Sequence, residues 1–304
     1  MSSAGAVMHG WINLDKPIGI TSAKAVAIIR KQLNCAKIGH GGTLDPLASG
    51  VLPIALGEAT KTVSYVMNSS KTYEFTLVWG HETTTNDSEG CPTRVSDKRP
   101  TREEIDNCLN EFRGTIKQAP PMYSAVKVNG KRAYSIVRSA EKKGENSKLA
   151  LEPREVMIHD LVLTSVNQKE ASFSVLCGKG TYIRSLGRDL ARRLGTAGHI
   201  SSLRRLSVGK FEVKDSISLD FLTSLRDSPD IHKNVISLLT VLDDIPALSV
   251  TPEVAVRIRL GQRVPFFKGS EIKNQISVAL CEGVAVALIK LDLGVIHPVR
   301  VFKL

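Results

Sequence analysis

Two widely separated segments alternate apolar and polar side chains, and this alternation restricts the fold more than any other feature of the chain. Residues 72–79 carry an aromatic or leucine side chain at every second position, and residues 171–177 alternate again, with Phe173, Val175 and Cys177 on one face. A period of two predicts strands with one buried face. Single helical patterns separate the strand patterns without strict alternation, so we expect an α+β fold.

Helix starts are marked by capping residues at three places. Thr21 or Ser22 can cap a helix that runs towards Leu33, and Thr101 with Glu104 forms a capping box. Thr251 precedes a proline at the first position of a short helix. Further helices are expected at 183–194, 219–225 and 235–242, and strands at 9–15, 276–281, 284–291 and 299–302. The glycine-rich segment 37–57 is expected to be a shaped loop.

Length and composition indicate an ordinary globular protein. A chain of 304 residues corresponds to roughly two domains, and 42% hydrophobic and 23% charged residues argue against disorder. No apolar run reaches the roughly 18–20 residues that span a bilayer, and the N-terminus does not resemble a signal peptide. Five cysteines without a C-x-x-C pair predict neither a disulfide framework nor a zinc site. We therefore expect a cytoplasmic protein with no membrane contact.

The charge balance suggests a polyanionic partner. Lys and Arg number 41 against 30 Asp and Glu, which gives a net charge of +11. The surplus is concentrated in residues 127–143 and 184–214. Nucleic acid is the usual partner of such a chain. Two solvated faces without a ligand are the alternative interpretation.

Asp45 is a candidate catalytic carboxylate. It lies between Leu44 and Pro46, among glycines and small residues, where it could act as a nucleophile or a base. It could equally cap a turn before Pro46. No phosphate-binding glycine motif and no metal-ligand spacing of histidines is present, so neither a nucleotide cofactor nor a metal is expected.

Tyr182 and Arg184 open the helix expected at 183–194. An aromatic ring beside a guanidinium suits a flat, anionic ligand, because the ring can stack and the arginine can pair with the anion. A core tyrosine next to a solvent-facing arginine is the alternative. Tyr73, near the start of the strand 72–79, has the same ambiguity.

Several motifs, taken in order along the chain, resemble those of the TruB family of bacterial tRNA pseudouridine synthases. The resemblance extends from about residue 9 to residue 210. The matching runs are Gly10-Trp-Ile-Asn-Leu-Asp-Lys-Pro-Ile-Gly19, Gly39-His-Gly-Gly-Thr-Leu-Asp-Pro-Leu-Ala-Ser-Gly50, Leu56-Gly-Glu-Ala-Thr-Lys61, Lys71-Thr-Tyr-Glu-Phe75, Phe112-Arg-Gly114, Gln118-Ala-Pro-Pro-Met-Tyr-Ser-Ala-Val-Lys127, Cys177-Gly-Lys-Gly-Thr-Tyr-Ile-Arg-Ser-Leu186 and His199 to Leu206.

This resemblance implies a fold and an activity. The fold is a pseudouridine synthase domain, α+β with a mixed, mostly antiparallel sheet, expected over residues 9–243 with an RNA-binding thumb insertion at about 123–153. A small PUA-like domain is expected over 244–304, where the match is loose. The activity is isomerisation of the uridine at position 55 in the T-arm loop of tRNA to pseudouridine, with no cofactor and no metal.

The resemblance also implies roles for individual residues. Asp45 corresponds to the nucleophile, Arg184 to its partner, and Tyr73 to the ring that stacks on the target base and is a candidate proton carrier. The remaining substrate contacts implied are His40, Tyr182, Leu203, Lys16 and Pro17. The expected contacts with the RNA backbone are Arg188, Arg192, Arg204, Arg205, Lys127, Lys131 and Arg132. Attack by Asp45 on the sugar C1′, attack on the base C6 and a glycal route all stay open.

Other functions are compatible with parts of the sequence. A pseudouridine synthase that needs a guide RNA and partner proteins would carry the same motifs, but the moderate length and the lack of long basic tails favour a monomer acting alone. An RNA-binding or RNA-folding protein without catalysis is disfavoured by the complete set of Asp45, Tyr73, Tyr182 and Arg184. A methyltransferase is disfavoured, because no glycine-rich nucleotide motif is present.

Overall fold

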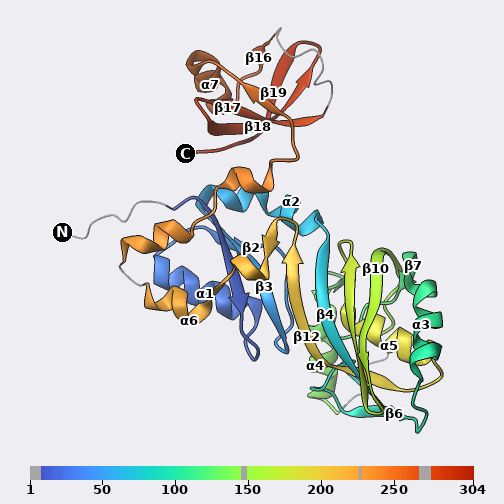
Figure 1. Cartoon of the computed structure of the whole chain (residues 1–304). Coiled ribbons are helices and arrows are strands. Elements are labelled where there is room, and N and C mark those ends of the chain that lie inside the picture. Colours follow the sequence, from blue (N-terminus) through green and yellow to red (C-terminus); the bar gives the residue numbers. More distant parts are fainter. Residues whose placement is uncertain (1–7, 145–148, 226–227, 267–274) are drawn as a thin grey trace. The chain divides into compact units, whose positions relative to one another are not determined.

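The computed structural model describes residues 8–144, 149–225, 228–266 and 275–304, which form two compact units (Figure 1). Of the described residues, those within 8–46, 51–67 and 209–304 belong to the first unit, and those within 47–50 and 68–208 belong to the second. Both units mix strands with helices without strict alternation, and the predicted α+β class is confirmed.

Short strands form the centre of the first unit. β1 (Gly10–Lys16) pairs in parallel with β14 (Ile217–Ser218) and neighbours β3 (Ala48–Leu56), which pairs antiparallel with β2 (Ile38–His40). Trp11, Ile12 and Leu14 are fully buried, so β1 is a core strand. The other elements are η1 (Gly57–Thr62), α2 (Val63–Asn68), β13 (Phe211–Glu212), η3 (Val213–Asp215), α6 (Leu219–Ser224), η4 (Pro229–Asn234) and η5 (Leu238–Val241).

Helix α1 (Ser22–Leu33) begins where its capping residue predicts. The Thr21 side chain accepts a hydrogen bond from the Lys24 amide, and the left-handed Asn34 ends the helix. Ala25 and Ile29 pack into the core. The same agreement holds for Thr101 with Glu104 before α3 (Arg102–Leu109) and for Thr251 before α7 (Pro252–Arg259).

The expectation of a single shaped loop over residues 37–57 is wrong. β2 and β3 occupy most of this segment, and only residues 41–47 connect them. β3 could not be predicted from the sequence, because its side chains are buried on both faces and therefore show no period of two. The helix expected at 235–242 is also wrong in type, since only the short 3-10 helix η5 forms there.

The last 60 residues of the chain build a small sheet with its own core. β15 (Ala247–Ser249), β17 (Ile276–Cys281), β18 (Val284–Asp292), β19 (Val295–Val301) and β16 (Val264–Pro265) pair in that order. Their core contains Val286, Ile289 and Ile296. This sheet and its packed helix fit the expected PUA-like domain, while the boundary at 243/244 stays a prediction.

The second unit contains the larger part of a sheet that has ten strands among the described residues. Its order is the start of β3, β12 (Gly198–Val208), β4 (Lys71–Trp79), β11 (Glu170–Cys177), β10 (Arg154–Val166) and β7 (Gly114–Gln118). All of these pairs are antiparallel except β3 with β12, so the predicted mixed, mostly antiparallel sheet is found here. Phe75 and Phe173 stack with ring centroids 5.0 Å apart. Helix α5 (Ile183–Arg193), α3, η2 (Asn110–Phe112), β5 (His81–Thr83) and β6 (Pro92–Val95) complete this part.

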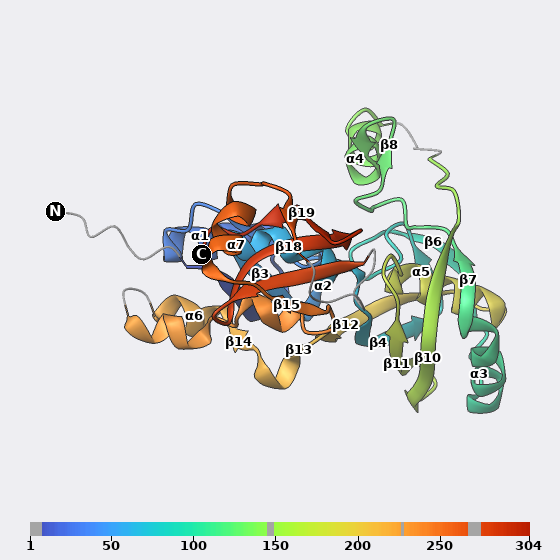
Figure 2. The same ribbon diagram turned by 90° about the horizontal axis from the view of Figure 1, so that it is seen from above.

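The expected thumb insertion forms a small substructure of its own. The β8 (Lys127–Val128) and β9 (Lys131–Arg132) strands form a hairpin that leads into α4 (Ala133–Glu141). In Figure 2, α4 and β8 lie together, apart from the strands of the sheet. Residues 145–148 of the expected thumb insertion lie outside the described residues. Of the helices in the described parts of the chain, none has the length and hydrophobicity that crossing a membrane requires.

Gly50 allows β3 to approach β12. Its φ is +101°, and a Cβ atom there would lie 2.2 Å from the Arg205 carbonyl oxygen. The parallel pairing of Ala48 with Leu203 and of Gly50 with Arg205 therefore requires a residue without a side chain.

We expect Gly50→Ala to destabilise the protein more than Gly114→Ala. Gly114 has a φ of +84°, but a Cβ atom added there would meet nothing within 4 Å, so it controls for backbone strain alone, about 1–2 kcal/mol. The clash at Gly50 should add about 1–3 kcal/mol. Urea denaturation monitored by circular dichroism measures both changes. If both variants lost the same unfolding free energy, β3 and β12 would be able to move apart at position 50 without an energetic cost.

Candidate active site

The loop that carries Asp45 is fixed from both sides in the first unit. The Leu44 amide donates to Ser22 Oγ at 2.8 Å, and the same hydroxyl donates to the Leu44 carbonyl at 3.0 Å. The Gly19 amide donates to the Pro46 carbonyl at 2.8 Å. Hydrogen bonds therefore hold both neighbours of Asp45, whose side chain is half-buried. A fixed backbone of this kind favours a positioned reacting group over a mobile surface carboxylate.

Lys16 holds the turn that supports this loop. It is fully buried, and its ammonium donates to the Pro17 and Ile20 carbonyls at 2.8 and 2.9 Å. The same turn contains Gly19, which reaches Pro46. Lys16 therefore acts on the loop through the backbone, while Pro17 is exposed at the surface.

His40 ends β2, five residues before Asp45. Its ring Nδ1 accepts a 3.4 Å hydrogen bond from the Gly42 amide, and the side chain is half-buried. His40 also lines a shallow hollow of about 410 Å³ together with residues of α1. Its imidazole is therefore accessible from outside the protein.

Tyr73 lies in the second unit on the buried face of β4, where 7% of its surface is exposed. The Arg205 guanidinium lies 6.0 Å from the centre of its ring, at cation–π distance. Leu203 pairs with Phe75 across the strands and with Ala48 on the other side. Three predicted substrate or RNA residues, Tyr73, Leu203 and Arg205, thus lie on adjacent strands.

Arg184 is held in place by several contacts, of which three lie in the second unit at Thr85, Asp87 and Tyr123. Its guanidinium donates to the Thr85 carbonyl at 2.9 Å and to the Tyr123 carbonyl at 3.0 Å. Its Nη1 lies 3.4 Å from Asp87 Oδ2, and both side chains are almost inaccessible. The sequence analysis missed Asp87, because it lies in the polar segment between two short strands and has no neighbouring motif. Its near-complete burial is the signal that reveals it.

Tyr182 precedes α5 and is half-buried. Its amide donates to the Gln118 side chain at 2.8 Å, which links the start of the helix to β7. Ser185, one residue after Arg184, donates to the Ala119 carbonyl at 2.8 Å. The helix start that carries the predicted aromatic and the arginine is therefore anchored to the segment after β7.

The expected RNA-backbone arginines differ in accessibility. Arg205 is 1% exposed and lies against the Tyr73 ring, and its contact with an RNA phosphate stays a prediction. Arg192 donates to both carboxylate oxygens of Glu82, at 2.9 and 2.5 Å. Arg188 pairs with Asp189 at 2.8 Å, and Arg204 donates to Ser49 at 3.2 Å.

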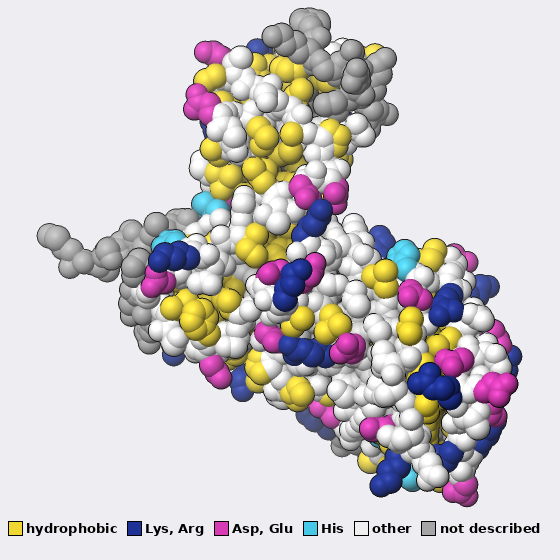
Figure 3. All heavy atoms as spheres, viewed as in Figure 1, with side chains coloured by type: hydrophobic (Ala, Val, Ile, Leu, Met, Phe, Trp, Pro, Cys, Tyr) yellow, Lys and Arg dark blue, Asp and Glu magenta, His cyan; other side chains and the backbone are white. Residues whose placement is uncertain are grey.

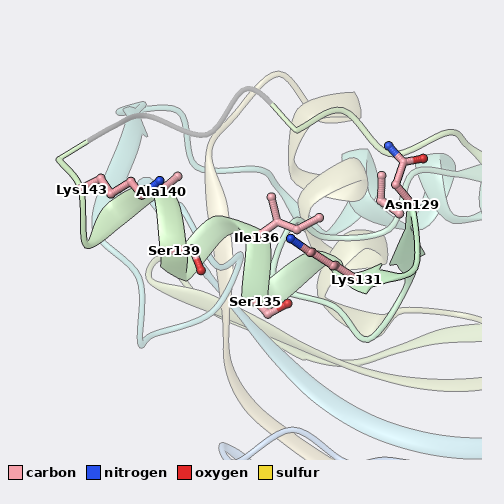
Figure 4. Close-up of a pocket in the computed structure, with 8 residues that line it drawn as sticks. Asn129, Lys131, Ser135, Ile136, Ser139, Ala140 and Lys143 are labelled. Atoms are coloured by element: carbon pink, nitrogen blue, oxygen red, sulfur yellow. The ribbon is translucent and has the colours of Figure 1, made fainter.

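The thumb residues, in contrast, are open to solvent. Lys127, Lys131 and Arg132 are all exposed. Lys131 and Lys143 line a hollow of about 720 Å³ beside α4, with Asn129, Ser135 and Ser139 among the polar residues (Figure 4). This hollow offers cationic and hydroxyl donors to a ligand, in keeping with a polyanion.

Lys71 and Cys177 are buried next to each other on paired strands near Arg205. The Lys71 ammonium donates to the Ser69 carbonyl at 2.5 Å. Burial, with the repulsion of Arg205, lowers the pKa of Lys71 to about 8, and burial raises the pKa of Cys177 to about 11. Among the described residues, no group of three or more His, Cys, Asp or Glu side chains is placed to hold a metal ion.

Comparisons with known proteins identify the family. The model of the TruB family pseudouridylate synthases (N-terminal domain) matches residues 30–183, and that of the tRNA pseudouridylate synthase B C-terminal domain matches 184–241. The tRNA pseudouridine synthase B of Zymomonas mobilis is 46% identical over 93% of this chain and 92% of its own length. The chain belongs to the TruB family. The corresponding protein of Caulobacter sp. strain K31 is 44% identical and covers 99% of this chain and 98% of its own.

Solved structures agree on the fold. A chain in the crystal structure of a Cbf5–Nop10–Gar1 complex has a TM-score of 0.72 and 26% identity, over 98% of this chain and 85% of that one. A chain in an H/ACA RNP bound to a substrate RNA containing 2′-deoxyuridine has a TM-score of 0.72 and 23% identity, over 98% and 86%. The TruB family consists of isomerases that modify RNA, so the expected family, fold and enzyme class are confirmed.

The buried lysine predicts a pH dependence of stability. Between pH 8 and 10.5 the unfolded chain binds a proton at Lys71 that the folded chain lacks, so this residue makes the unfolding free energy rise with pH in that window. The unfolding free energy of Lys71→Met, taken relative to that of wild type, should therefore be highest at pH 7 and should decrease towards pH 10.5. Chemical denaturation across this range measures it, with the exposed Lys169→Met as control. If the difference in unfolding free energy between Lys71→Met and wild type did not change with pH, the lowered pKa of Lys71 would be contradicted.

Proposed function

We propose that this TruB-family isomerase acts in the cytoplasm, as a monomer and without a cofactor, on the T-arm loop of tRNA, where it converts the uridine at position 55 to pseudouridine. The observation that carries the proposal is the fixed loop of Asp45. Its neighbours are held by Ser22 and Gly19, and three residues later the chain pairs with the strand that carries Leu203. The relatives named tRNA pseudouridine synthase B support tRNA as the substrate.

The target base must leave its loop to reach Asp45. Extrusion costs a few kcal/mol, and stacking on an aromatic ring recovers about 1–3 kcal/mol. We assign this stacking to Tyr73. The cation–π contact with Arg205 holds the Tyr73 ring from within the protein, so little rotational freedom is lost when the base arrives. Leu203 and Tyr182 would supply further contacts with the base.

The reaction breaks the bond between N1 of uracil and C1′ of the ribose and forms a bond between C5 and C1′. The uracil turns between the two steps, N1 gains a proton, and the proton on C5 is released to solvent. Asp45 is proposed as the nucleophile, on the sugar C1′ or on the base C6, or as the base of a glycal route. All three routes need an ionised carboxylate in a site that RNA covers.

Arg184 is proposed to keep Asp45 ionised and oriented. A guanidinium near a carboxylate favours its charged form, most strongly where water is excluded. Two carbonyls and Asp87 fix the Arg184 guanidinium before the substrate binds. Because these partners use the planar fork of donors, lysine would not replace it. Asp87 is therefore a positioning residue for Arg184.

The thumb, together with Arg188, Arg192 and Arg204, is proposed to contact RNA phosphates. Lys127, Lys131 and Arg132 are exposed there, and charge-assisted contacts with phosphates position a nucleic acid without reading its sequence. Catalysis without guide RNA or partner proteins is part of the proposal, and the Cbf5–Nop10–Gar1 complex represents the alternative.

We expect Asp45→Asn to abolish catalysis while tRNA still binds. Amide and carboxylate have nearly the same shape, so affinity should stay within a few-fold, whereas the rate should fall by at least about a thousandfold. Tritium release from C5-labelled uridine in a T-arm stem-loop measures the rate, and filter binding measures affinity.

The control for this experiment is Asp106→Asn on α3, a carboxylate that is 50% exposed. It should behave like wild type in both measurements. Tritium release by Asp45→Asn at the wild-type rate would rule out Asp45 as the nucleophile. If neither wild type nor Asp45→Asn released tritium while both still bound the RNA, the result would favour an RNA-binding protein without this catalysis.

A further inference from the structure

The basic residues that a count of charges assigns to RNA are largely paired within the protein. Arg193 donates to both oxygens of Glu111, at 2.7 and 2.5 Å. Lys210 lies 3.0 Å from Asp243, and Lys214 lies 2.8 Å from Glu212. With the pairs of Arg184, Arg188 and Arg192, most of the block 184–214 is neutralised. On the face drawn in Figure 3, Lys and Arg side chains lie interspersed with Asp and Glu.

Helix α1 has the opposite charge pattern. Residues 16–44 contain no Asp or Glu, but they contain five cations, Lys16, Lys24, Arg30, Lys31 and Lys37. Within the part of the chain that the structure describes, no ion pair forms at Lys24, Arg30 or Lys31. This positive charge is therefore available to a partner, and the sequence analysis missed it because the run is spread over a helix rather than clustered.

The outer face of α1 combines these cations with small side chains. Ala23, Val26, Ala27, Arg30 and Lys31 follow the spacing i, i+3, i+4, i+7 and i+8, so they share one face, and four of the five are exposed. The opposite face, with Ser22, Ala25 and Ile29, is buried.

The outer face of α1 is also hollowed. With Ile38, Gly39 and His40 of β2, its five residues line the hollow of about 410 Å³. Small side chains let a ligand backbone approach the helix closely, while the two cations lie on its last two turns. A hollow, unpaired cations and an accessible imidazole thus occur together in one place.

The residues that line the hollow are joined to the Asp45 loop in two ways. His40 ends β2, five residues before Asp45, and Ser22 at the start of α1 hydrogen-bonds to Leu44. Arg30 lies eight residues further along the helix, about 12 Å at 1.5 Å per residue. That distance corresponds to the span of a few nucleotides. An RNA whose uridine reaches Asp45 therefore passes within reach of this face.

We propose that the outer face of α1, together with β2, is a docking site for the RNA backbone that flanks the target uridine. The proposal rests on the proposed function for the choice of RNA, and on charge complementarity for the choice of a polyanion. Arg30 and Lys31 pair with phosphates, the alanines accommodate the sugars, and His40 lies at the end towards the flipped base. The face supplies affinity and register rather than chemistry.

The test is the double variant Arg30→Ala/Lys31→Ala, measured by the affinity for a T-arm stem-loop over a range of salt concentrations. Each lost phosphate contact lowers the salt slope by about 0.7–0.9, so we expect a decrease of about 1.5 and an affinity loss of about tenfold or more. The control is Arg102→Ala/Lys169→Ala, which removes two exposed cations outside α1 and should bind like wild type.

A second pair of variants tests the hollow itself. Ala27→Glu introduces a carboxylate at the centre of the outer face, and Ala27→Gln introduces the uncharged amide of nearly the same shape. Repulsion of phosphates should make the glutamate variant bind several-fold more weakly than the glutamine variant, and salt should reduce the difference. Equal affinities of the two variants would contradict a phosphate near Ala27.

Arg30 and Lys31 also lie at the C-terminal end of α1, where cations stabilise a helix through its dipole. If this were their only role, the double variant would melt at a lower temperature but keep the wild-type affinity and salt slope, and the proposal would be overturned. If wild type released no tritium while the double variant still lost affinity and salt slope, the proposed function would fail and the RNA-docking face would stand.

Discussion

The close approach of β3 to β12 is the constraint on which the proposed site depends. Only a glycine fits at position 50, because any Cβ would collide with the Arg205 carbonyl. The pairing that results places the chain just after Asp45 beside Leu203, and the same strand carries Arg205 to the Tyr73 ring. A backbone contact without side-chain chemistry thus fixes the chain that follows the proposed nucleophile, Asp45.

Charge is divided between two tasks in this protein. Several arginines are held by contacts within the protein: Arg205 lies against the Tyr73 ring, Arg184 is fixed by Asp87, and Arg192 is bound by Glu82. Lysines and arginines on the thumb and on α1 stay exposed. A net charge of +11 therefore favours a polyanionic partner. Which surfaces are available to that partner depends on which cations form ion pairs within the protein.

The sequence was most informative where local rules decide the structure. Thr21, Thr101 and Thr251 cap the predicted helices, and the alternation at 72–79 gives β4, because capping and period depend on neighbours in the chain. β3 was missed, because burial on both faces removes the alternation. The motifs identified the family and suggested Asp45, but Asp87 and the burial of Arg205 depend on contacts between distant segments, which no local pattern records.

The central claim is that a uridine of the T-arm loop is the substrate, and mapping the product tests it most directly. Unmodified full-length tRNA would be incubated with the purified protein alone, and pseudouridine would be located by chemical labelling and primer extension. The account predicts one product, at position 55, in wild type and none in Asp45→Asn. Pseudouridine at another position, or formation only after a guide RNA or a partner protein is added, would contradict it.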